Sequence, residues 1–141
     1  MENCGISIKI YRLGRFFYTH KCTPISKIFY AINYLLFGCI IPSSSKIGKG
    51  TSIAHSVGVV VHHTAIIGQN SKILHNVTIG NTGVIIGDNV LLGAGCVIQG
   101  PCKIGDNVKI GANTFVNFDV PDGATVVGSK GRIISKDTPK S

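Results

Sequence analysis

The most regular feature of the chain is an aliphatic position that recurs every six residues from about residue 41 onward. A period of six fits neither an α-helix nor simple strand alternation. Repeats of this kind predict a stacked solenoid, in which each repeat supplies one short strand and one corner. The aliphatic position is occupied by Ile41, Ile47, Ile53, Val61, Ile67, Ile73, Ile79, Ile86, Leu92, Ile98, Ile104, Ile110 and Val116.

A second recurring position lies four residues after each aliphatic one and is mostly small. Three repeats are expected to close one triangular coil, giving roughly four to five coils with the aliphatic side chains stacked inside. The second position, expected beside these ladders, holds Thr51, Val57, Ala65, Ser71, Val77, Gly83, Val90, Cys96, Cys102, Val108, Thr114 and Val120. The pattern therefore predicts a mainly β fold, a parallel β-helix.

Glycine and asparagine recur where the corners are expected. Both residue types suit backbone conformations with positive φ, and pairs such as Asp88-Asn89 and Asp106-Asn107 repeat at the same place. Two steps of the aliphatic position are longer than six residues: eight from Ile53 to Val61, and seven from Ile79 to Ile86. Such a break in a regular solenoid is where a side chain can be aimed outward.

The N-terminal segment has apolar residues at helical spacing instead. We expect two short amphipathic helices, about 6–20 and 24–37, separated by Pro24 and capping the first coil. Weak docking to a membrane surface through these helices is the alternative. The apolar run 28–37 is too short to span a bilayer. The predicted organisation is a helical cap at 1–38, a β-helix at 39–128 and a basic C-terminal tail at 129–141.

Charge and cysteine content narrow the function classes. The net charge of +8 lies on the two flanks, and no basic stripe with interleaved aromatics is present, so nucleic-acid binding is not expected. None of the five cysteines forms a CxxC motif. Free thiols and the lack of a recognisable signal peptide favour a cytoplasmic location. Cys96 and Cys102 occupy the small inward position and are expected to be buried and inert.

Histidine is the candidate chemical group. Four of the five histidines cluster at positions 55, 62, 63 and 75, and His55 lies in the longer register break. A reaction in which a hydroxyl attacks its substrate needs a base that accepts the hydroxyl proton, and neutral imidazole suits that task near neutral pH. His62 and His63 are expected to cover a solvent-facing turn.

Two segments resemble serine acetyltransferases. They are 46–61, which contains Ile53-Ala54-His55-Ser56-Val57-Gly58, and 73–80, which reads Ile73-Leu74-His75-Asn76-Val77-Thr78-Ile79-Gly80. The similarity covers about residues 27–134 and is strongest to short relatives associated with surface polysaccharides. The resemblance implies a left-handed β-helix, an acetyl-CoA-dependent O-acetyltransferase activity and a homotrimer with each active site between two chains.

The same resemblance assigns roles to single residues. His55 matches the family's general base. Gly80, Asn81, Thr82, Ala94 and Ala112 match positions that contact CoA, where small side chains let backbone amides approach the pantetheine arm. His75 stands where serine acetyltransferases commonly have Gln and is a candidate acceptor contact. No metal is expected.

Three departures from the family pattern bear on the acceptor. The Asp that orients the family's base is replaced by Ile40, and the acidic residue before that base is Ala54. The Arg-His loop that holds the serine carboxylate is missing between Gly83 and Ile86. These departures favour a sugar hydroxyl over serine as the acceptor. Loss of the orienting Asp predicts a rate that is lower by orders of magnitude.

Two other functions remain open on the sequence. One is a weakly active or non-catalytic hexapeptide scaffold. The other is a metal-dependent enzyme of the γ-carbonic anhydrase kind, which binds zinc through three histidines on the same type of solenoid. The histidine spacing here does not match that second family well.

Overall fold

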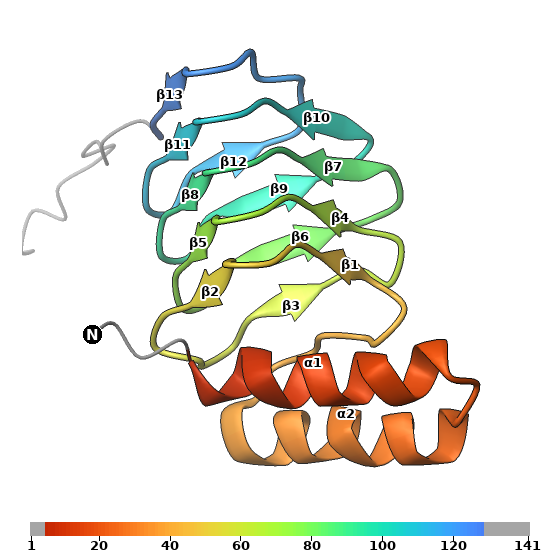
Figure 1. Ribbon diagram of the computed structural model, residues 1–141. Helices are drawn as coiled ribbons and strands as arrows, with labels where there is room; N and C mark the ends of the chain where they lie inside the picture. The colour runs from red at the N-terminus through yellow and green to blue at the C-terminus, as the bar shows by residue number, and fades with distance from the viewer. Residues whose placement is uncertain (1–4, 129–141) are drawn as a thin grey trace, which may run out of the picture.

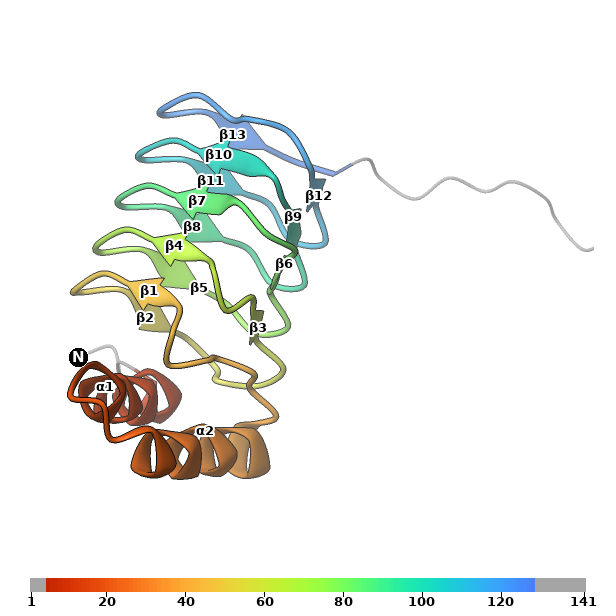
Figure 2. The same ribbon diagram turned by 90° about the vertical axis from the view of Figure 1, so that its right-hand side faces the viewer.

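The computed structural model describes residues 5–128 as a triangular parallel β-helix that stands on two helices (Figures 1 and 2). The predicted basic tail, 129–141, lies outside the described residues. Three parallel sheets form the faces of the prism. The first face contains β1 (Lys46–Ile47), β4 (Ile66–Ile67), β7 (Val84–Ile86) and β10 (Cys102–Ile104). The second contains β2 (Ser52–Ile53), β5 (Lys72–Ile73), β8 (Leu91–Leu92), β11 (Lys109–Ile110) and β13 (Thr125–Val126). The third contains β3 (Val60–Val61), β6 (Thr78–Gly80), β9 (Val97–Gln99) and β12 (Phe115–Val116).

The register of the strands confirms the predicted ladders. On the second face, Ile53 pairs with Ile73, Ile73 with Leu92, and Leu92 with Ile110, so the same repeat position stacks from coil to coil. All thirteen residues of the aliphatic position are at most 7% exposed. Their stacking removes apolar surface from water at every coil and supplies the core of the prism.

Two members of the predicted small inward position are wrong. Val57 is 58% exposed and Gly83 is also exposed, whereas Val59 and Val84 are buried in their places. Both errors fall at the two longer steps of the repeat. The extra residues bulge outward at these steps. A later residue, Val59 or Val84, therefore takes the inward position.

Most of the glycines that follow the aliphatic position are required by coil spacing, not by positive φ. A Cβ on Gly48 would lie 2.6 Å from the backbone oxygen of Gly68 in the next coil. Positive φ is instead found at a different corner position, mostly at asparagines such as Asn70, Asn89 and Asn107. The coils are tied further by Asp88, whose carboxylate accepts a hydrogen bond of 2.6 Å from the Gln69 N–H below it.

The two N-terminal helices agree with the prediction to within about a residue. They are α1 (Ile6–Thr19) and α2 (Thr23–Phe37), and Pro24 lies in the first turn of α2 and not between the helices. Proline is compatible with a first helical turn because the N–H that it lacks would have no helical partner.

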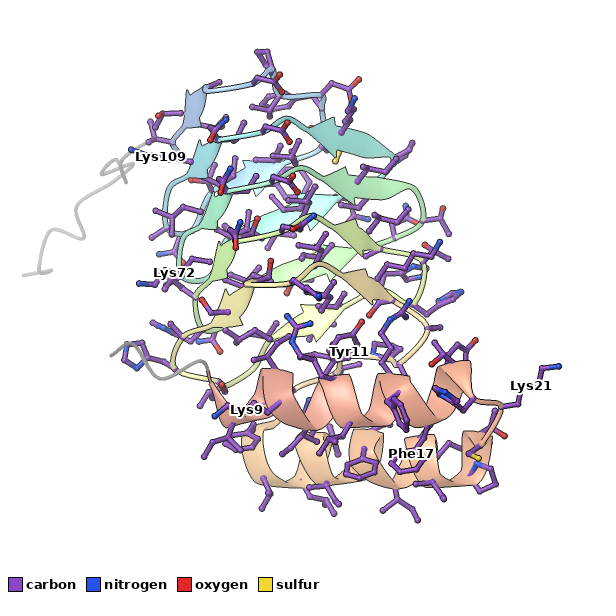
Figure 3. All side chains as sticks on the ribbon, in the orientation of Figure 1. Lys9, Tyr11, Phe17, Lys21, Lys72 and Lys109 are labelled. Atoms are coloured by element: carbon purple, nitrogen blue, oxygen red, sulfur yellow. The ribbon has the colours of Figure 1, made fainter. Side chains whose placement is uncertain are left out.

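Helix α1 covers the open end of the first coil. The buried Tyr11 hydroxyl donates to the backbone oxygen of Ser45 at 2.7 Å, and Figure 3 shows this side chain between α1 and the coil. Arg15 donates to the backbone oxygens of Ser43 and Ser45, and Arg12 to that of Gly48. These bonds satisfy carbonyls that a bare solenoid end would expose, so the predicted cap is confirmed.

Helix α2 packs mainly on α1 (Figure 2), and at its C-terminal end Phe37 also reaches the first coil, where its backbone oxygen accepts from the Gly58 N–H at 3.2 Å. Its outward side is apolar: Leu35 is 79% exposed and Leu36 is 66% exposed. The predicted amphipathic pattern therefore identified the helix correctly, although several of its apolar positions face outward. Within residues 5–128, neither helix is long and apolar enough to cross a membrane.

Candidate functional site

The longer register break places His55 on the outside of the prism. Residues 54–58 turn the chain from the second face to the third, and His55 at their centre has a φ of 54°. This left-handed conformation is uncommon for a residue other than glycine or asparagine, and such residues often lie at functional sites. The neighbouring Ser56 is buried, whereas the His55 side chain is exposed. The prediction that His55 points outward is confirmed.

His75 occupies the same corner one coil further on. The Asn76 N–H donates to the Val57 oxygen at 2.9 Å, which ties the two coils together at this point. The imidazoles of His55 and His75 meet edge to face, with ring centroids 6.0 Å apart. Together with Val57 they line an open hollow.

One polar side-chain atom beside this hollow lacks a hydrogen-bond partner. The buried Nδ1 atom of His75 has no hydrogen-bond partner among the described residues. A buried polar atom without a partner is costly unless a ligand or water completes it. The hollow is thus lined by the exposed His55 imidazole and by the His75 imidazole, whose buried Nδ1 atom has no partner within residues 5–128.

The part of the chain that forms the site carries positively charged side chains and no carboxylate. Residues 5–87 contain eight lysines and arginines and no aspartate or glutamate; the first acidic residue after them is Asp88. No carboxylate from that stretch therefore orients either imidazole. Ile40, where the family pattern has its orienting Asp, is half-buried and pairs with Val60 on the third face, next to the corner that carries His55.

Two of the predicted CoA-binding positions continue the same corner. The Gly95 N–H donates to the His75 oxygen at 3.0 Å, and the Asn113 N–H donates to the Ala94 oxygen at 2.8 Å. Ala94 is half-buried and Ala112 is exposed. We call this column of residues, 54–58, 74–76, 93–95 and 111–113, the His55 corner.

The other three predicted CoA-binding residues are not brought to that corner. Gly80, Asn81 and Thr82 follow β6, whereas His75 precedes it, so they lie at the opposite edge of the third face. The Asn81 side chain donates to the Gly100 oxygen at 3.2 Å and accepts from the Thr82 N–H at 2.9 Å. Asn81 therefore also has a structural role in its corner. We call 62–65, 80–83 and 99–101 the Asn81 corner.

His62 and His63 belong to the Asn81 corner, which confirms that they cover an outer turn. Their ring centroids are 4.2 Å apart, and Nδ1 of His62 lies 2.9 Å from the Thr64 hydroxyl. The four clustered histidines are thus divided between two corners. Among the described residues, no three His, Cys, Asp or Glu side chains come together in a way that would hold a metal ion.

One residue of the hollow was missed by the sequence reasoning. Val57 was assigned to the core because it stands four residues after Ile53. The step of eight residues to Val61 was the signal that could have corrected this assignment, since only one of the valines at 57 and 59 can be turned inward.

The buried thiols are chemically quiet. Burial raises the pKa of the Cys96 thiol to about 12, and burial followed by the nearby Asp119 charge raises the pKa of Cys102. A thiol held in its neutral form is a poor nucleophile. Both cysteines therefore serve as small core side chains, as predicted.

Comparison with known proteins matches residues 83–117 to the family described as bacterial transferase hexapeptide (six repeats). The chain is 40% identical to serine acetyltransferase 5 of Arabidopsis thaliana over 95% of this chain and 46% of that protein. It is 38% identical to the serine acetyltransferase of Helicobacter pylori over 90% of this chain and 78% of that protein. The chain spans less than half the length of the plant relatives that it matches.

Solved structures give the same likeness. The serine acetyltransferase of Neisseria gonorrhoeae in complex with serine superimposes with a TM-score of 0.81 at 34% identity, covering 90% of this chain and 55% of that one. A serine acetyltransferase in complex with CoA gives a TM-score of 0.82 at 32% identity, covering 91% and 55%. These matches confirm the left-handed β-helical fold.

Proposed function

Because the chain belongs to the serine acetyltransferase family, we propose that it transfers the acetyl group of acetyl-CoA to a hydroxyl oxygen, with His55 as the general base. The observation that carries the proposal is the exposed His55 imidazole, held at a register break and facing a hollow shared with His75. The relative solved with CoA supports the choice of donor.

The proposed reaction balances with the groups present. A ring nitrogen of His55 takes the proton of the acceptor hydroxyl while its oxygen attacks the thioester carbonyl, forming a tetrahedral oxyanion. Collapse of this intermediate breaks the carbon–sulfur bond, and the imidazolium returns the proton to the departing thiolate. The products are the acetyl ester and free CoA. His75 lines the same hollow and is proposed to contact the acceptor through its imidazole ring.

We propose serine as the acceptor. The relatives at 38–40% identity are named for serine, and one solved neighbour holds serine. The preference for a sugar hydroxyl that the sequence suggested finds no support in these comparisons. Residues 5–87 carry eight lysines and arginines and no carboxylate. They provide an electropositive setting suited to an acceptor that carries a carboxylate.

The acceptor is tested by measuring thiol release from acetyl-CoA with L-serine, L-serine methyl ester and a panel of sugars. The methyl ester keeps the hydroxyl but lacks the carboxylate charge. We expect kcat/KM to be highest for L-serine and at least tenfold lower for the ester. A higher value for any sugar than for L-serine would overturn the choice of serine while leaving the acetyl transfer itself in place.

We further propose a homotrimer with each site shared between two chains. The two sets of predicted CoA-binding residues lie at opposite edges of the third face, so one chain alone does not gather them. A cyclic assembly places one edge of a chain beside the other edge of its neighbour, because such interfaces are heterologous. Ala94 and Ala112 of one chain would then line a CoA groove with Gly80, Asn81 and Thr82 of the next.

Mixing two inactive variants tests the shared site. His55→Asn and Thr82→Leu alter opposite edges, and both side chains are exposed. Chains that are unfolded and refolded together should regain activity, since some interfaces combine two unaltered edges. Lack of recovery in mixed trimers, with recovery in a wild-type control, would place the whole site within one chain.

The proposed location is the cytoplasm, where the four free cysteines of the described chain would stay reduced. The scaffold alternative is decided by CoA titration of the purified protein, because a non-catalytic module would show no saturable binding. The γ-carbonic anhydrase alternative is decided by metal analysis of the purified protein; within one chain His55 and His75 form one pair and His62 and His63 another, at separate corners.

A further inference from the structure

A second hollow, unconnected to the His55 corner by any lining residue, lies where the helical cap meets the first coil. It has a volume of about 330 Å³. Its walls come from the end of α1, the first turns of α2 and the loop 42–44; they include Tyr18, Thr23, Ser26, Lys27, Tyr30 and Ser43. Hydroxyl groups, one ammonium group and two phenol rings therefore face one small space.

The start of α2 makes this space favourable for an anion. The residue before the helix, Cys22, makes no side-chain capping bond, and the first turn carries no acidic residue. The N-terminal amides of a helix and its dipole favour negative charge at that end. Lys27, five residues after Cys22, adds a positive charge near the same end of the helix. A positive charge near a helix N-terminus is unfavourable unless an anion accompanies it.

The Ser26 side chain gives a separate indication of a ligand. Ser26 is only 4% exposed and lies in the wall of the hollow. Its hydroxyl has no hydrogen-bond partner within the described residues, and the hydroxyl oxygen is not fully closed off from the surface. The hydroxyl of a nearly buried serine normally has a partner, and here the hollow is the side from which a partner can reach it.

The surroundings exclude a cationic ligand. Residues 5–87, which include the cap and the first coil, contain no carboxylate. Arg15 adds positive charge behind the wall, since its guanidinium donates to the backbone oxygens of Ser43 at 2.9 Å and Ser45 at 2.6 Å. Lys21 extends from the same end of α1 (Figure 3). An anion entering the hollow therefore meets no carboxylate from residues 5–87.

We propose that this hollow binds the phosphate group of a phosphomonoester. Phosphate has enough acceptor oxygens to use the Thr23, Ser26 and Ser43 hydroxyls together with the Lys27 ammonium group. Tyr18 and Tyr30 line the hollow and would pack on the body that carries the phosphate. That body is a small molecule in solution or a lipid headgroup, and the apolar outer side of α2 beside the hollow is compatible with either source.

The test is calorimetric titration of the full-length protein with glycerol 3-phosphate, at constant ionic strength. We expect saturable binding that Lys27→Gln weakens at least tenfold and Ser26→Ala weakens severalfold. Lys9→Gln is the matched control, because it removes one exposed charge from α1 without touching the hollow. It should change the affinity less than twofold. Circular dichroism establishes that each variant is folded.

A parallel arm uses vesicles of phosphatidylcholine with and without phosphatidic acid, whose headgroup is a phosphomonoester. Binding that depends on phosphatidic acid and on Lys27, without binding of glycerol 3-phosphate, identifies a lipid as the source. Equal losses in Lys27→Gln and Lys9→Gln, or no saturable binding in either arm, would overturn the proposal. Loss of glycerol 3-phosphate binding in the presence of saturating CoA would also overturn it, because the phosphate would then occupy the CoA groove. Acetyl transfer is measured separately, so failure here leaves the proposed function unaffected.

Discussion

His55 and His75 meet edge to face at 6.0 Å although twenty residues separate them in the sequence. The coil between them is longer than the regular coil of three six-residue repeats, and the extra length lies in residues 54–58, where His55 is turned outward. The same irregularity thus supplies the outward imidazole and keeps the ladder from Ile53 to Ile73 in register. A regular hexapeptide coil would place a corner residue there with no such side chain in the hollow.

Replacing His55 by Asn should abolish most of the acetyl transfer while preserving the fold. Asparagine tolerates the left-handed conformation with φ of 54° that this position requires, so the corner is not strained. Removal of a general base lowers the rate by about 10²- to 10⁴-fold. The measurement is thiol release from acetyl-CoA at saturating donor and acceptor, with thermal unfolding as the check on folding.

His20→Asn is the matched control, because His20 is an exposed histidine at the end of α1, away from both corners. It should retain activity within about threefold of wild type. Acceptor-dependent thiol release that is unchanged in His55→Asn would remove His55 from the chemical step.

Gly48→Ala should destabilise the β-helix by about 1–3 kcal/mol through overpacking. The added Cβ would lie 2.6 Å from the Gly68 carbonyl oxygen, and a backbone atom of a hydrogen-bonded coil has little room to move. Gly38→Asn, at a helix C-cap with φ of 61° and open space around it, should cost less than about 1 kcal/mol. Urea unfolding of both variants gives the comparison, and a larger loss in Gly38→Asn would show that backbone conformation, not coil spacing, governs these glycines.

The inward ladder was predictable because it rests on a strict repeat. Each aliphatic residue packs on the residue one coil away, and the sequence therefore states the contact directly: Ile73 and Leu92 occupy the same repeat position. The two register breaks were visible in the sequence as longer steps between aliphatic positions. Which residues point inward at each break was not visible. Whether Val57 or Val59 turns inward depends on how the bulge is accommodated. Both positions hold valine, so the sequence pattern does not distinguish them.

The site was predictable in part for the same reason. The outward placement of His55 followed from the break, whereas its pairing with His75 was not predicted and results from the stacking of adjacent coils. Matching single residues to the family pattern could not show that Gly80, Asn81 and Thr82 lie away from the His55 corner. Their position depends on the third face of the prism, which lies between the two corners. The outward apolar side of α2 was missed because helical periodicity does not say which neighbour a helix packs against.

The raised pKa of Cys96 predicts a loss of stability in alkaline solution. Burial raises the pKa of this thiol from 9.0 to about 12 in the native state, so the unfolded chain releases the proton first. Stability is therefore unaffected by this group below about pH 9 and falls as the pH rises from 9 toward 12, by up to about 1.4 kcal/mol per pH unit. Urea unfolding at pH 8 and pH 10 should show a larger loss for the wild type than for Cys96→Ala. Equal losses would mean that the Cys96 thiol ionises as readily in the native protein as in the unfolded chain.

Ala112→Leu should weaken the use of acetyl-CoA without destabilising the fold. Ala112 is exposed on the His55 corner, two coils beyond His75, and its small side chain leaves the backbone of the corner accessible. A leucine there would fill the space that the pantetheine arm needs under the proposed binding mode. We expect the KM for acetyl-CoA to rise about tenfold or more, with kcat at saturating donor reduced far less, since the substitution removes binding and not the base. Gln69→Leu, an exposed substitution of similar character at the corner between the first and second faces, should leave the KM for acetyl-CoA within twofold. If both substitutions have the same effect, the donor does not lie along the His55 corner, and Ala94 and Ala112 are plain corner residues of the solenoid.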